Sequence, residues 1–142
     1  MPLLVSAVRM NVNSNNILWV DCTAAASVGA LVLALSPWLS SLYGLPLPFL
    51  WFLGAINLTY GCYSFSLAAR PHRGLRSLHV LIVGNGLWAI LCLAFASLFW
   101  TTATAFGIAS LLAEAIVVGT LARLEWQWRD ALVTAREPPH PH

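Results

Sequence analysis

Charge is what this sequence has least of. Only 8% of its 142 residues are charged, whereas an ordinary soluble domain carries roughly 25%. It contains no lysine, and seven arginines against five acids give a net charge of +2, which is too small to indicate a nucleic-acid partner. With 59% hydrophobic residues and a mean hydropathy of +0.77, the chain is predicted to be an integral membrane protein.

Patterns for disulfides and metal sites are also missing. The cysteines lie singly in apolar runs, at Cys22, Cys62 and Cys92, without a Cys-x-x-Cys pair. His79 has no second histidine at a suitable depth for haem ligation. We therefore expect no metal and no cofactor.

Four apolar runs are long enough to cross a bilayer as helices. Because they do not alternate between apolar and polar residues, the strands of a membrane barrel are a poor interpretation. Thr101 and Thr102 are expected to cap the last helix. The prediction is an all-α, integral membrane four-helix bundle, with 1–142 as a single membrane domain. Its spans are about 17–42, 48–69, 78–100 and 103–124, followed by a cytoplasmic interfacial segment and a disordered tail within 125–142.

Arginine is distributed unevenly among the connections. It occurs before the first run, between the second and third, and at or after the end of the fourth, whereas the other two connections carry no charge. By the positive-inside rule both termini and the central connection are cytoplasmic. The two halves are a candidate tandem repeat of helical hairpins. We expect a multi-pass protein of a bacterial inner (plasma) membrane.

Two carboxyl groups fall inside the apolar runs, Asp21 and Glu114. Such groups cost at least ~2.5 kcal/mol at a span centre and usually face a partner or a cavity. At a rise of about 1.5 Å per residue, Glu114 and Asn85 both lie about 14 Å from the inner interface and should share one level. Asp21 is shallower, and we expect it to pair with Arg76 or Arg123.

Helical spacing places further polar side chains on common faces. Asn57, Tyr60 and Ser64 follow i, i+3, i+7, and Asn85 and Trp88 follow i, i+3. We predict that these faces surround a hydrated pocket open to the cytosol, with Asp21 at its margin. The predicted ligand-binding residues are Asn57, Tyr60, Ser64, Asn85, Trp88 and Glu114. In the structural alternative, Glu114 only holds the spans together by bonding to Asn85 or Asn57.

Three classes of function stay open. A carboxyl group in low dielectric favours its protonated form and can exchange the proton for a cationic substrate, with aromatic faces nearby. This favours binding or transport of a small cationic or amphipathic molecule, by a homo-oligomer because four spans enclose little volume. The alternatives are a membrane enzyme acting on a lipid-soluble substrate, with Glu114 and Asp21 as acid and base, and a non-catalytic accessory subunit of a membrane complex.

The end of the fourth run has the pattern of a surface helix. Glu125 and Arg129 have the i, i+4 spacing of an exposed ion pair. Trp126 and Trp128 are typical of an anchor at the membrane interface. The expected role of this segment is structural.

Overall fold

The described part of the chain is built from helices alone. A computed structural model describes residues 14–70 and 74–134. Four helices follow one another in these residues, which contain no strand: α2 (Ser14–Tyr43), α3 (Leu47–Ala68), α4 (Leu75–Leu98) and α5 (Ala105–Thr134). The all-α prediction is therefore confirmed. The predicted tail, from 136 onward, lies outside the described residues.

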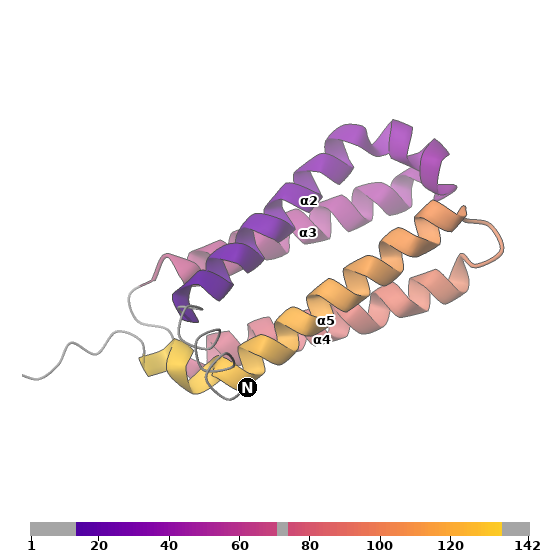
Figure 1. The fold of residues 1–142 in the computed structure, drawn as a ribbon. Coiled ribbons are helices and arrows are strands. Elements are labelled where there is room, and N and C mark those ends of the chain that lie inside the picture. Colours follow the sequence, from indigo (N-terminus) through magenta and orange to yellow (C-terminus); the bar gives the residue numbers. More distant parts are fainter. Residues whose placement is uncertain (1–13, 71–73, 135–142) are drawn as a thin grey trace, which may run out of the picture.

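The helices form two hairpins, as predicted. Helix α2 packs mainly against α3, and α4 mainly against α5, while the two hairpins meet chiefly through α2 and α5 (Figure 1). The backbones of α3 and α4 lie apart, but their aromatic side chains meet, since Phe49 and Phe52 of α3 both contact Phe95 of α4. We call the end that holds Ser14, Thr134 and the α3–α4 connection the terminal end. The opposite end, with connections 44–46 and 99–104, is the hairpin end.

Three of the helices are long and apolar enough to cross a membrane: α2, α4 and α5. Helix α3 has 22 residues, but an asparagine, two tyrosines and several hydroxyl residues lower its hydropathy. The three candidate spans indicate a multi-pass membrane protein, and the crossing of the bilayer by α3 stays a prediction.

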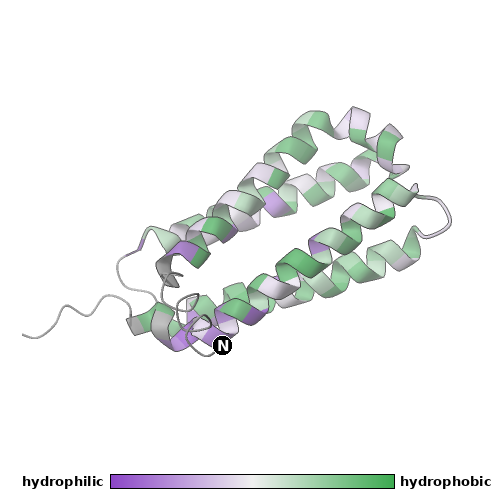
Figure 2. Cartoon of the chain, in the orientation of Figure 1, coloured by the Kyte–Doolittle hydropathy of each residue, from purple (hydrophilic) through white to green (hydrophobic). Residues whose placement is uncertain are grey.

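The surface is apolar and the interior holds polar groups. Large hydrophobic side chains point outward along the helices, including Leu98 (70% exposed) and Ile116 (69% exposed), while Asp21 and Glu125 are buried. Figure 2 shows apolar residues covering most of the helices, with the more hydrophilic positions toward the terminal end and between the hairpins. This arrangement suits a hydrocarbon surround, because polar groups in lipid must find partners inside the protein.

Glycines let α2 and α3 pack closely. A Cβ atom on Gly29 would lie 2.6 Å from the backbone nitrogen of Leu58, and one on Gly61 would lie 2.7 Å from that of Ala26. Small residues at such positions allow direct backbone approach between membrane helices. The first hairpin is therefore held by contact between backbones as well as side chains.

The hairpin end joins the two hairpins through Thr104. Its hydroxyl donates to the carbonyl oxygen of Leu42 (2.7 Å), and its N–H donates to that of Tyr43 (2.8 Å). The same hydroxyl accepts the N–H of Gly107 (3.2 Å), which makes Thr104 the N-cap of α5. The predicted caps at Thr101 and Thr102 are wrong, because these residues lie in the turn before the helix.

Apolar side chains from all four helices close both ends of the bundle. At the terminal end the cluster includes Leu18, Leu67, Leu81 and Leu132. At the hairpin end the cluster includes Leu39, Leu50, Leu53, Ala96 and Leu111. The polar groups lie between these two clusters.

We expect Gly29→Ala to destabilise the protein. The added methyl group would meet backbone atoms of α3, and overpacking of this kind costs about 1–3 kcal/mol. The midpoint of unfolding in mixed detergent micelles measures the change.

Gly86→Ala is the matched control. A Cβ at Gly86 meets nothing within 4 Å, and alanine is favoured over glycine inside a helix by about 0.5–1 kcal/mol. Equal effects of the two substitutions would contradict close packing between α2 and α3.

Candidate functional site

Glu114 connects α5 to α3 and α4. Its Oε1 accepts hydrogen bonds from Asn57 Nδ2 (2.9 Å) and from Trp88 Nε1 (2.8 Å). Among the described residues no group bonds to its second oxygen, and the side chain is only half-buried. Three predicted site residues therefore meet, and the expected bond to Asn57 is present. The expected bond to Asn85 is not.

Asp21 is held by α3. Its Oδ2 accepts the hydroxyl groups of Tyr60 (2.9 Å) and Ser64 (2.6 Å), and the residue is only 2% exposed. The predicted pairing with Arg76 or Arg123 is wrong. Since α2 begins at Ser14, Asp21 lies two turns inside the helix, on the face that packs against the polar stripe of α3.

Asn85 bonds to Glu125 rather than to Glu114. Its Nδ2 donates to Glu125 Oε2 (3.0 Å), and Glu125 is fully buried. Gly119 lies opposite Ala89 in the second hairpin. Because α4 and α5 are antiparallel, Arg123, four residues after Gly119, lies at the level of Asn85, four residues before Ala89. The prediction had placed Arg123 at the level of Arg76. The two arginines are therefore not at one depth, and the shared level expected for Asn85 and Glu114 is wrong.

Glu125 is the buried residue that the sequence prediction missed. It lies on the buried face of α5, in the series Leu111, Val118, Glu125 and Leu132, whose members are seven residues apart. Leu111 and Leu132 are both buried. That heptad spacing was the available signal, but the nearby arginines and tryptophans suggested a surface helix.

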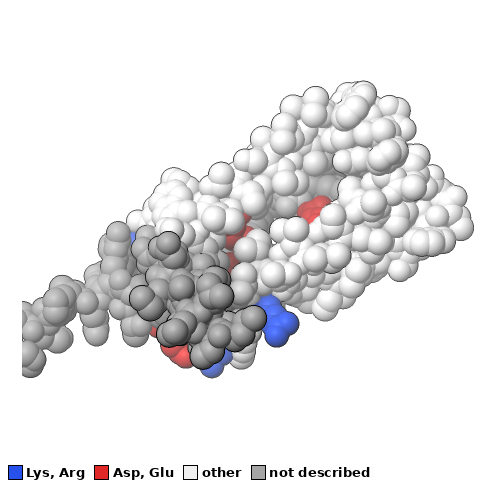
Figure 3. Space-filling model, in the orientation of Figure 1, with Lys and Arg blue, Asp and Glu red and all other residues white. Residues whose placement is uncertain are grey.

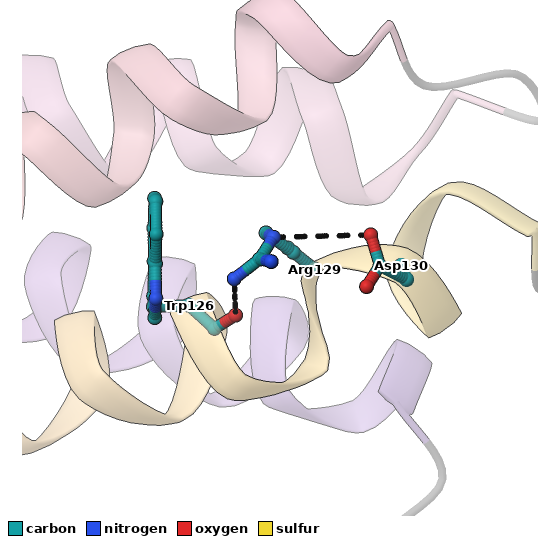
Figure 4. Close-up of polar contacts among 3 residues, drawn as sticks. All are labelled: Trp126, Arg129 and Asp130. Atoms are coloured by element: carbon teal, nitrogen blue, oxygen red, sulfur yellow. Dashed lines mark hydrogen bonds and ion pairs between the residues drawn. The ribbon is translucent and has the colours of Figure 1, made fainter.

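Arg129 does not pair with Glu125. Its guanidinium lies over the ring of Trp126, 4.4 Å from the centroid, and its Nη1 donates to the Trp126 carbonyl oxygen (3.2 Å). Its Nε lies 3.8 Å from Asp130 Oδ1 (Figure 4). The predicted surface pair of Glu125 with Arg129 is thus wrong, and Arg129 is placed by its nearer neighbours on the exposed side of α5.

A cavity of about 540 Å³ lies between the two hairpins. All four helices line it, and most of its lining residues are apolar, such as Val28, Ile56 and Val117. Among the described residues, Asp21 and Glu114 are the only charged ones in the lining. Of the predicted site residues, Asn57, Tyr60, Asn85, Trp88 and Glu114 line the cavity, whereas Ser64 is buried behind Asp21.

The cavity opens on the side of the bundle. Figure 3 shows a hollow between the two hairpins on the long side of the molecule, with acidic side chains visible inside it. The prediction placed the opening toward the cytosol. If the helices cross the bilayer, this lateral opening faces hydrocarbon instead.

Comparison with known proteins gives no relative from which the chemistry of the site could be inferred. No family model matches the chain, and no characterised protein or solved structure is significantly similar to it. Its chemistry therefore rests on its own residues. Among the described residues, no three His, Cys, Asp or Glu side chains are grouped to hold a metal ion.

We expect Ser64→Ala to destabilise the protein by about 1 kcal/mol. The substitution removes one of the two donors to the buried Asp21 carboxyl, and the cost of such a loss lies near this value. Ser66→Ala on the same helix is the control, because Ser66 is only half-buried and, among the described residues, bonds to the Tyr63 carbonyl oxygen alone. Unfolding midpoints in detergent micelles would contradict the role of Ser64 if both variants matched the wild type.

Proposed function

We propose that the protein binds a small amphipathic molecule with a cationic group, in the cavity between the hairpins. The single observation that carries this proposal is the position of Glu114. One oxygen of its carboxyl group is fixed by Asn57 and Trp88, and the other has no partner among the described residues. A carboxyl group held this way at the wall of an apolar cavity can accept a positive charge or an N–H donor from a ligand.

The aromatic neighbours of Glu114 support a cationic ligand. Trp88 and Tyr60 both line the cavity, and aromatic faces attract cations more strongly where water is excluded. None of the described lining residues is an arginine or histidine that would repel a positive group or neutralise the acids. The charged side chains of the described lining, Asp21 and Glu114, are therefore both acidic.

The apolar walls support an amphipathic molecule over a small inorganic ion. A volume of about 540 Å³ is within the range of pockets that hold drug-sized ligands. Valine, leucine and isoleucine side chains of α2, α3 and α5 would cover the apolar part of the molecule. The lateral opening would let such a molecule enter from the bilayer.

The enzyme alternative has less support. Asp21 and Glu114 both line the cavity, but separate partners hold them: hydroxyl groups for Asp21 and N–H donors for Glu114. An acid and base pair would act on one substrate from both positions. No contact of the described residues joins the two groups.

Binding of tetraphenylphosphonium by the protein in lipid nanodiscs tests the proposal. We expect saturable binding above that of empty nanodiscs, and weaker binding of tetraphenylborate, which has nearly the same shape and the opposite charge. Glu114→Gln removes the charge and keeps an oxygen for Asn57 and Trp88. We expect it to weaken binding of the cation about tenfold or more, since a cation in such a site gains about 1.4 kcal/mol or more.

Asp130→Asn is the matched control, because it removes an acid from an exposed position of the same helix. It should bind the cation as the wild type does. Equal affinity of wild type and Glu114→Gln, or equal binding of the two probes, would overturn the proposal.

A further inference from the structure

Glu125 has an oxygen that lacks a hydrogen-bond partner. The residue is fully buried, its Oε2 accepts the Asn85 amide, and its Oε1 is the one buried side-chain atom without a partner that the described residues contain. Buried polar atoms are almost always satisfied in folded proteins. An orphaned carboxyl oxygen therefore points to a missing donor or a missing cation.

The Asp21 carboxyl group is the acidic group that interacts with Glu125. The two groups interact electrostatically, and both interact with the Tyr60 hydroxyl. Asp21 is also buried, and Tyr60 and Ser64 both donate to its Oδ2, while the Asn85 amide lies beside the same carboxyl group. Asn85 therefore lies beside both buried carboxyl groups, and Glu125 Oε1 is left without a partner among the described residues.

No positive group faces this pair from the described helices. Asp21 comes from α2, Tyr60 from α3, and Glu125 from α5, while α4 contributes the neutral amide of Asn85. The guanidinium of Arg129 is turned to Trp126 and Asp130. Two negative charges without a counter-charge are costly in a low dielectric.

We propose that Asp21 and Glu125 together bind one monovalent cation, a proton or Na⁺. The cation lies between the unpaired Glu125 Oε1 and the Asp21 carboxyl group, with the Tyr60 hydroxyl beside them. A proton on Glu125 Oε1 would be donated to the Asp21 carboxyl group, and Na⁺ would be coordinated by both groups. Glu114 is not part of this site, although Asp21 also lines the cavity, and occupation of the site does not require the proposed organic ligand.

Thermal unfolding of the protein in nanodiscs tests the site without any organic cation. One series varies pH in choline chloride, and a second replaces choline by Na⁺ at a fixed alkaline pH. We expect the melting temperature of the wild type to rise by about 5–10 °C as the cation saturates the site. A rise with acid alone identifies the proton, and a rise with Na⁺ at alkaline pH identifies Na⁺.

Glu125→Gln should abolish this dependence. The amide keeps an oxygen for Asn85 and puts an N–H where the orphaned oxygen lies, so the variant should resemble the occupied wild type without any cation. Asp21→Asn tests the same site from α2 and decides the matter if Glu125→Gln does not fold. Asp130→Asn, an exposed acid of α5, should keep the full dependence of the wild type.

The proposal is overturned by two results. One is a wild-type melting temperature that responds neither to pH nor to Na⁺ beyond the response to choline. The other is a dependence that persists unchanged in Glu125→Gln or Asp21→Asn, which would place the cation elsewhere.

Discussion

Buried carboxyl groups determine how the four helices are joined. In an apolar surround each must find donors within the protein, and the donors come from α3 and α4 while the acids come from α2 and α5. The backbones of α3 and α4 lie apart, yet Asn57 of α3 and Trp88 of α4 bond to the same oxygen of Glu114. Glu114 therefore links the two hairpins by hydrogen bonds, beside the aromatic contact of Phe52 with Trp88.

The cavity follows from uneven packing between the helices. Glycines bring α2 and α3 into backbone contact, and Thr104 fastens the second hairpin to the end of the first. Apolar clusters close both ends of the bundle. Between these contacts the space between the two hairpins stays unfilled, with the polar side chains at its walls.

Local patterns in the sequence predicted the helices, the hairpins and the inward-facing polar stripes that hold Asn57, Trp88 and Glu114, because the rise and the period of a helix are fixed. The depth of each helix could not be predicted the same way. Arginine served as a depth marker, but the packing of Gly119 against Ala89 places Arg123 at the level of Asn85. Because the two arginines lie at different depths, Asn85 bonds to Glu125 and not to Glu114. The same difference in depth explains why Glu125 was assigned to the surface.

The acids differ in their access to the cavity. Glu114 and Asp21 both line it, whereas Glu125 is enclosed behind the Asn85 amide and interacts with Asp21. Asp21 is therefore the one side chain that belongs to both the enclosed pair and the cavity wall. If a cation occupies the pair, it reduces the negative field that Asp21 adds to the cavity, and a cationic ligand beside Glu114 is held less tightly. By linkage the ligand weakens the enclosed cation to the same degree, so the two sites would oppose each other.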